Sequence, residues 1–340
     1  LYQRALSIFE KTLGQESTKT ALVQAHIAHT FLLTGQPDLA IIFLKSAVNS
    51  YQLQREWISN IGSAELKSYT KSVEGTYRGL ASTLTDQGRL DEAQLVLDML
   101  KEDEQFEFVR RSANADPRRS RMAFNATEQA WTQRYRQVAD RLAALGAEEV
   151  ALQKQAKLGL TAEQQQRQKA LAADLAVARQ AFQAFLDELR SSFAQKGPAR
   201  ALEVVETSQK ALRDLQSLLK GLGDDAVLLQ YYVTDDKVGM LLTTPGVQLA
   251  RSSQVNAKDL NRQIAEFRRL LRDPKSNPQP AAQALYQLLV APVAQDLAQA
   301  GAKTVMLSLD GALRYVQFAA FHDGQQYLAH KWNLRMYTSV

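Results

Sequence analysis

The stretch Thr304-Val305-Met306-Leu307-Ser308-Leu309-Asp310-Gly311 decides the fold class of the last third of this 340-residue chain. Residues 304–309 form a short apolar run of the kind that is buried in a parallel sheet. Asp310-Gly311 is a turn signal that ends this strand. A buried strand needs neighbouring strands and covering helices, and we therefore expect both on either side of it.

The surrounding residues supply these elements. The predicted elements are, in order, strands at 227–233, 238–244 and 247–251, helices at about 256–272 and 280–299, and a last strand at 332–337. Turn signals separate them, namely residues 234–237, Pro245-Gly246, and a loop that contains Pro274, Pro278 and Pro280. Strands that flank helices indicate an α/β sheet over residues 221–340.

Two apolar stripes with alternating 4-3 spacing precede the sheet and predict a pair of long helices. The first stripe is Trp131, Tyr135, Val138, Leu142 and Leu145, and the second is Leu171, Leu175, Ala178, Phe182, Phe185 and Leu189. This spacing turns a narrow apolar face towards a partner helix. Gly159 favours a helix end, and Thr161 with Gln164 forms a capping-box pattern that opens the next helix. We expect an antiparallel hairpin over about 126–157 and 162–195, and coiled-coil pairing between two chains is the alternative.

A further helix follows the hairpin. Gly197-Pro198 ends one helix and starts another, because proline is tolerated in a first turn. Its apolar face consists of Leu202, Val205, Leu212, Leu215 and Leu219, and Gly221 and Gly223 end it. The hairpin and this helix together form a predicted connector over residues 126–220.

Two glycines near the start of the chain sit in the same local pattern, which predicts paired helices. Ala28 and Ala40 lie seven residues before and five after Gly35, and Ala81 and Ala93 hold these positions around Gly88. A small residue in each helix lets the two helices approach closely, and the glycine ends the first helix in a left-handed conformation. The pattern resembles the tetratricopeptide repeat, whose period is about 34 residues. A generic helical bundle is the alternative.

The repeats are predicted to occupy residues 1–100. Residues 2–13 match the second helix of an earlier repeat, whose first helix is missing from the chain. Gly35 and Gly88 are 53 residues apart, so we expect one inserted helix at about 48–70, with Trp57 in it. The proline that often ends such a repeat is absent.

A charged segment at 101–125 separates the repeats from the hairpin. Acidic residues come first, and Arg110, Arg111, Arg118, Arg119 and Arg121 follow them. A cluster of arginines is typical of a phosphate-binding patch. We favour a solvated linker, because the acidic and basic halves partly neutralise each other.

Composition excludes several kinds of chemistry. The chain has no cysteine, so these residues can form no disulfide, thiolate zinc site or cysteine nucleophile. The net charge of +5 is too diffuse to predict a nucleic-acid partner. No apolar run approaches the roughly 18 residues that a membrane span needs, and we expect a soluble chain. The chain starts without Met or a signal-peptide pattern, so its compartment stays unknown.

The α/β segment resembles a known family. The matching residues are 222–232 (LGDDAVLLQYY), 241–246 (LLTTPG), 309–314 (LDGALR), 318–324 (FAAFHDG) and Tyr327-Leu328. They are similar to the CHAT domain, a caspase-like domain associated with tetratricopeptide repeats. Gln317 stands where a proline commonly precedes the phenylalanine. The predicted fold is therefore mainly α, with repeat-like helices and a long antiparallel helical hairpin, followed by an incomplete α/β caspase-like sheet.

The resemblance implies a cysteine endopeptidase of the caspase type, in which a His and a Cys at the ends of later strands form the catalytic dyad. The same resemblance suggests a bacterial source. Because the chain has no cysteine, no position can take the catalytic role, and we expect a fragment truncated at both ends. The strands at 304–309 and 332–337 would then lack neighbours at their edges, so the isolated chain should aggregate or bind its missing half.

The histidines carry little catalytic signal. We expect His322, beside Asp323-Gly324, to be a turn histidine that bonds to the backbone. His26 and His29 have a spacing found in metal sites, but no carboxylate accompanies them, and the repeat pattern already explains the helix. We therefore assign no catalytic, cofactor or metal residue.

Binding is the better expectation for the repeats. In tetratricopeptide repeats the first helix of each pair lines a concave groove, which by register would contain His29, Leu32, Arg78, Ser82 and Thr85. We expect a protein or peptide partner there, with the oligomeric state open. Two functions follow: a caspase-like peptidase regulated by its repeats, whose nucleophile lies outside this chain, or a non-catalytic adaptor with a degenerate α/β domain.

Overall fold

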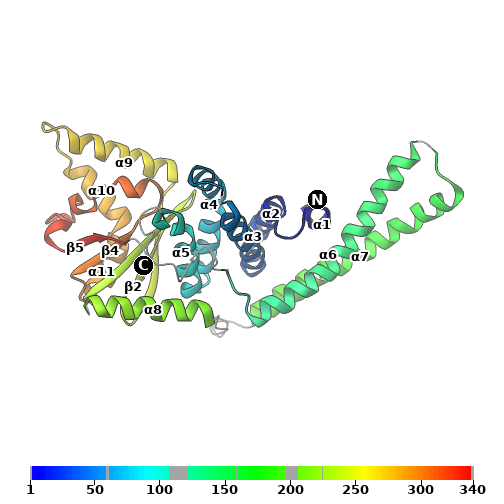
Figure 1. Ribbon diagram of the computed structural model, residues 1–340, viewed down its shortest axis with the longest axis horizontal. Coiled ribbons are helices and arrows are strands. Elements are labelled where there is room, and N and C mark those ends of the chain that lie inside the picture. The colour runs from blue at the N-terminus through cyan, green and yellow to red at the C-terminus, as the bar shows by residue number, and fades with distance from the viewer. Residues whose placement is uncertain are drawn as a thin grey trace. The chain divides into compact units, whose positions relative to one another are not determined.

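The computed structural model describes residues 2–58, 61–106, 121–157, 159–195, 206–223 and 225–337 (Figure 1). The chain divides into two compact units, each built from two segments that are distant in sequence. The hairpin unit is Leu1–Leu66 with Arg118–Val205, and the sheet unit is Lys67–Pro117 with Glu206–Val340. We predicted four segments that follow one another along the chain. In the structure, the second predicted repeat belongs to the same unit as the sheet.

Helix pairs built around a glycine turn are confirmed. In the hairpin unit, α1 (Tyr2–Leu13) packs against α2 (Thr18–Leu33), and α2 packs against α3 (Pro37–Ile58). Gly35 between α2 and α3 has a φ of 69°, the left-handed conformation that glycine adopts without strain. Ala28 and Ala40 are completely buried, which allows the two helices to approach closely.

The second pair is α4 (Ser63–Asp86) and α5 (Leu90–Phe106), and nearly all of it belongs to the sheet unit. Gly88 has a φ of 73°, and Ala81 and Ala93 are again fully buried. The helix that we predicted at 48–70 is wrong. The spacing between the two glycines is taken up by long helices of 22 and 24 residues, α3 and α4. No glycine or proline interrupts α3 after Val48, so the helix continues to Ile58.

The predicted hairpin is confirmed as α6 (Ala126–Ala156) and α7 (Ala162–Gln195), which lie side by side in Figure 1. The capping box forms as expected, with the backbone N–H of Gln164 donating to Thr161 Oγ1 at 3.2 Å and the Gln164 side chain accepting from the Thr161 N–H at 3.0 Å. The two apolar stripes meet within the chain, where Trp131 packs edge-on against Phe185. The leucine at 189 lies where only the backbone is described.

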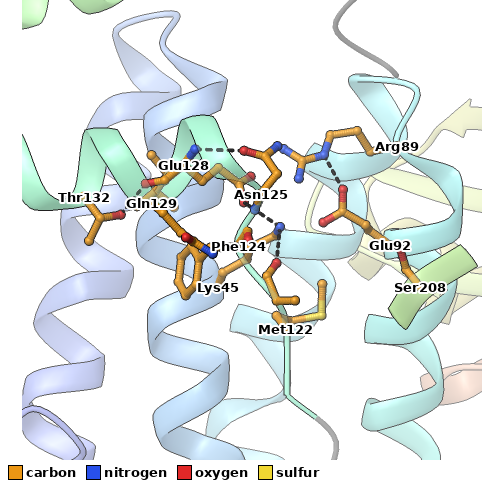
Figure 2. A network of polar contacts seen from close by, with 12 residues as sticks. Lys45, Arg89, Glu92, Met122, Phe124, Asn125, Glu128, Gln129, Thr132 and Ser208 are labelled. Atoms are coloured by element: carbon orange, nitrogen blue, oxygen red, sulfur yellow. Dashed lines mark hydrogen bonds and ion pairs between the residues drawn. The ribbon is translucent and has the colours of Figure 1, made fainter. Parts of the chain in front are cut away.

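A buried ion pair anchors the start of the hairpin to α3. Lys45 Nζ donates to Glu128 Oε2 and to the Ala123 carbonyl, both at 2.8 Å, and its side chain is fully buried. Figure 2 shows the Lys45 side chain reaching Glu128 beside Phe124. Asn125 caps α6 through a reciprocal capping box with Glu128. Lys45 therefore connects the first turn of α6 to α3.

The sheet has five strands in the order β3-β2-β1-β4-β5. They are β1 (Ala226–Val233), β2 (Lys237–Thr243), β3 (Gln248–Gln254), β4 (Thr304–Ser308) and β5 (Asn333–Met336). β1 pairs antiparallel with β2 and parallel with β4, and β4 pairs parallel with β5. The prediction that the strand at 304–309 lacks a neighbour is wrong, because β4 is paired on both sides and only the short β5 lies at that edge.

Helices cover both faces of the sheet. Alternate residues of β1 point to opposite faces. Val227, Leu229 and Tyr231 share a core with α9 (Ala257–Arg272), α10 (Gln279–Leu289) and α11 (Ala291–Gln299), whereas Leu228 packs with Leu215 and Leu219 of α8 (Glu206–Leu222). α5 contacts α8 and β3.

We predicted a single helix at 280–299. This prediction is wrong in one respect, because the structure has two helices there, α10 and α11, which meet at Val290. Pro292 has no backbone N–H and starts a new first turn there. The predicted arginines at 110, 111, 118 and 119, the turn at 197–198 and the apolar positions 202 and 205 lie outside the described residues. Among the described helices, none is long and apolar enough to cross a membrane.

Candidate functional site

Several polar contacts of the sheet unit join the helix pair α4–α5 to the carboxyl end of β4, and we call this region the helix–sheet junction. Arg78 of α4 binds the carboxylate of Asp310 through Nε at 2.8 Å and Nη2 at 2.9 Å. Asp310 Oδ2 also accepts the backbone N–H of Val233 at 2.9 Å, so one carboxylate connects α4 with the ends of β1 and β4. The Asp310 side chain is only 1% exposed.

The electrostatics at Arg78 favour its charged form. Burial alone would lower the pKa of Arg78, but the hydrogen bonds and the charge of Asp310, with a smaller contribution from Glu74, raise it above its ordinary value. A two-pronged arginine–carboxylate contact is among the strongest and most directional in proteins. The pair therefore holds α4 in a defined position against the sheet.

Lys101 of α5 makes the second connection. Its ammonium donates to Ser308 Oγ at 2.5 Å and to the Leu309 carbonyl at 2.9 Å, and both Lys101 and Ser308 are buried. A serine beside a lysine is also the arrangement of Ser–Lys hydrolases. That chemistry needs an accessible serine and an uncharged lysine. Ser308 is completely buried and not accessible to a substrate, so we interpret the contact as structural.

Asp98, one turn before Lys101, lies partly buried between α5 and the sheet. It accepts hydrogen bonds from Gln94 Nε2, at 3.0 and 3.1 Å, and from Gln230 Nε2 of β1 at 3.2 Å. Burial raises the pKa of Asp98 to about 6, although the two amides and the charge of Lys101 act in the opposite direction. This carboxyl therefore changes its charge in a weakly acidic range.

Tyr232 places an aromatic ring between α4 and the sheet. Burial raises the pKa of Tyr232, and the nearby side chains of Thr85 and Ser82 act in the opposite direction. Tyr232 lies directly opposite Gly239 in the antiparallel pair of β1 and β2. Its ring covers Gly239 so closely that a Cβ atom there would overlap the ring. The glycine is therefore required for the ring to occupy this position over β2.

The five residues that we predicted to line a groove belong to two different units of the chain. Arg78, Ser82 and Thr85 belong to the sheet unit and contact Asp310 or Tyr232. His29 and Leu32 lie on the exposed side of α2 in the hairpin unit. Sequence reasoning missed Asp98, Lys101 and the role of Asp310. An aspartate directly after a buried strand is the one signal that could have indicated Asp310, since such strand ends commonly carry functional side chains.

The histidines fit simpler roles. His322 Nδ1 accepts the Gly324 N–H at 3.0 Å, and the ring packs edge-on against Tyr327, which confirms the expected turn histidine. His26 stacks on Tyr2 with a centroid distance of 5.5 Å. Within the described residues no group of three or more histidine and acidic side chains is arranged to hold a metal ion.

Comparison with known families supports a relationship for the last part of the chain. The family model described as CHAT domain matches residues 279–340. This segment contains α10, α11, β4 and β5, and thus Ser308 and Asp310 of the helix–sheet junction. The match relates the segment to a caspase-like, peptidase-related family. No curated protein matches the chain, and no solved structure matches it.

Proposed function

We propose that this chain is the recognition and control portion of a caspase-like cysteine endopeptidase with tetratricopeptide repeats. The paired helices bind a protein partner, and the pair α4–α5 transmits that event to the CHAT-like sheet. The observation that carries the proposal is the two-pronged contact of Arg78 with Asp310, because it joins a repeat helix to the strand end within the matched CHAT segment.

The repeat assignment has support in the packing of the helices. Both pairs place a left-handed glycine at the turn and fully buried alanines at the helix contact. These positions are equivalent in the two pairs, as in tetratricopeptide repeats. The long helices α3 and α4 depart from the period of about 34 residues.

Partner recognition is proposed for the exposed side of α2. Its sequence contains no acidic residue, and His29, Leu32 and Leu33 are exposed there. The proposal gives the other residues of the predicted groove a different role, which is to couple α4 to the sheet. These residues are Arg78, Ser82 and Thr85. A peptide or helix with apolar side chains would suit binding at the exposed side of α2.

Catalysis needs a group that this chain does not contain. A caspase-type reaction uses a thiolate activated by an imidazole, and none of the 340 residues is cysteine. The nucleophile in this proposal therefore lies outside these residues, and the chain alone is inactive. The same observation favours a second candidate, a non-catalytic adaptor in which the α/β segment serves only for assembly.

The test uses the protein that contains this chain, treated with a thiol-directed affinity probe of the caspase type. We expect covalent labelling that changes when Arg78 is replaced by Ala, while the protein remains folded by circular dichroism. Labelling that is insensitive to Arg78 would contradict coupling through α4. A folded protein that the probe does not label at all would refute the peptidase and leave the adaptor.

A further inference from the structure

The hairpin unit contains an open groove between α1 and the hairpin α6–α7, separate from the α2 surface discussed above. We call it the α1–hairpin groove, and it encloses about 780 Å³, within the usual size of ligand sites. Leu142, Leu175 and Phe182 form its floor, and Arg4, Ile8 and Arg179 line its sides. All of these residues belong to the hairpin unit.

The floor of the groove is the apolar seam of the hairpin. Leu175 and Phe182 come from the stripe that packs α7 against α6, and Leu142 comes from the facing stripe. Ile8 of α1 stays 49% exposed at the rim, a high value for a large apolar side chain beside an apolar floor. The seam can therefore receive one more apolar surface.

A glycine in the middle of α6 shapes the wall. A Cβ atom at Gly146 would lie 3.1 Å from Cδ of Arg4, tighter than ordinary packing, so the glycine allows the Arg4 stem to lie on the α6 backbone. Glycine weakens the interior of a helix by about 1 kcal/mol relative to alanine. The room that Gly146 leaves allows Arg4 to line the groove with its guanidinium group.

The charges of the groove are unbalanced. Two arginines of the hairpin are paired, Arg134 with Glu188 and Arg167 with Glu148. Arg4 and Arg179 have no ion-pair partner in the part of the chain that the structure describes. Among the described residues that line the groove, Glu149 is the single acidic one. An apolar floor with two available guanidinium groups is complementary to an apolar surface that carries carboxylates.

We infer that the α1–hairpin groove binds an acidic amphipathic helix of a partner protein. Such a helix would lie along the seam of α6 and α7 with its leucine-type side chains on the floor. Its carboxylates would meet Arg4 and Arg179. The groove is open and runs beside two long helices, which suits a third helix better than a small enclosed ligand.

The test uses the full chain and two synthetic probes. The first is an amphipathic peptide of about 20 residues with leucines at i, i+3, i+4 and i+7 and glutamates beside them, and the second has lysines instead of glutamates. Binding is measured by fluorescence anisotropy at low salt, where contacts between exposed charges are least screened. We expect the acidic peptide to bind at least about tenfold more tightly than the basic one.

Charge reversal provides the decisive comparison. Arg4→Glu with Arg179→Glu should reverse the preference between the peptides, and Arg141→Glu, at an exposed arginine of α6 that does not line the groove, should leave it unchanged. Circular dichroism and the unfolding midpoint show that the variants are folded. Failure of the acidic peptide to bind, or binding that the double reversal does not alter, would overturn the inference.

Two further measurements identify other occupants. Sedimentation that detects self-association, lost in the double variant, would assign the groove to a second copy of this chain and contradict a partner helix. Decanoate tests a fatty acid as the occupant. If decanoate binds in a way that depends on Arg4 and Arg179 and the acidic peptide does not bind, the inference of a partner helix is contradicted. The inference is independent of the peptidase proposal, because it concerns only the hairpin unit.

Discussion

Arg78 and Asp310 are 232 residues apart in sequence, and their side chains form two hydrogen bonds of 2.8 and 2.9 Å. The same carboxylate accepts the backbone N–H of Val233. Three segments, α4, β1 and the turn after β4, therefore depend on one buried charge pair. The second helix pair is consequently an integral part of the sheet unit.

Removal of Arg78 should destabilise the sheet unit strongly. Arg78→Met leaves the Asp310 carboxylate buried with only one described donor, and we expect a loss of about 2–4 kcal/mol in the free energy of unfolding. Asp310→Asn in the Arg78→Met background should recover part of this loss, because the uncompensated charge disappears. Urea unfolding followed by the fluorescence of the buried Trp332 measures both effects.

An exposed pair provides the control for that experiment. Arg269 and Glu266 on α9 are within 2.7 Å but lie at the surface, and Arg269→Ala should leave the unfolding midpoint unchanged. Equal effects of Arg78→Met and Arg269→Ala would show that the contact with Asp310 does not hold the unit together.

Gly239 should not tolerate a side chain. Gly239→Ala forces the Tyr232 ring away from β2 and from its contacts with α4, and we expect a loss of about 1–3 kcal/mol. Gly246→Ala is the matched control, because it lies in the turn after β2 and a Cβ atom there has open space around it. If the two variants unfold at the same urea concentration, the ring does not depend on the glycine.

Much of the fold could be predicted from local patterns. Gly35 and Gly88 marked the helix turns, and the capping box of Thr161 and Gln164 marked the start of α7, because these signals act within a few residues. The apolar run at 304–309 predicted a parallel strand, since burial on both faces leaves its mark on the sequence itself.

The helix–sheet junction could not be predicted in the same way. Arg78 occupies an ordinary helix position, and its partner lies far along the chain. Lys101 and Asp98 likewise read as surface charges of an amphipathic helix until α5 is packed on the sheet. The register suggested a groove for Arg78, Ser82 and Thr85, but their contacts with Asp310 and Tyr232 depend on tertiary packing that local spacing does not encode.

The stability of the sheet unit should depend on pH through Asp98. Its folded pKa of about 6 is above the ordinary value of 3.8, so the folded state binds the proton more tightly than the unfolded state. The contribution of Asp98 to stability is therefore greatest below about pH 4 and falls as the pH rises to about 6. The total change is on the order of 3 kcal/mol.

Asp98→Asn isolates this effect. At pH 7 the variant should be more stable than the natural chain by about 1–3 kcal/mol, because no carboxylate between α5 and the sheet needs to ionise. At pH 4 the two proteins should unfold at the same urea concentration. A difference that does not change between pH 4 and pH 7 would show that Asp98 titrates normally.

Lys45 should be required for docking of the hairpin on α3. Lys45→Met leaves Glu128 buried without the cation, and we expect a loss of about 3 kcal/mol, measured by unfolding through the buried Trp131. Lys45→Met with Glu128→Gln should recover much of it, since Gln can still accept the Asn125 N–H in the capping box. A double variant that is no better than the single one would contradict this explanation.

Hydrogen exchange at Val233 tests most directly whether α4 controls the strand ends. The Val233 amide donates to Asp310, and Arg78 holds that carboxylate. In Arg78→Ala we expect the Val233 amide to exchange at least about tenfold faster, together with residues 309–316. The amides of α7 should keep their rates. An unchanged exchange rate at Val233 in a folded Arg78→Ala variant would contradict coupling between the helix pair and the sheet.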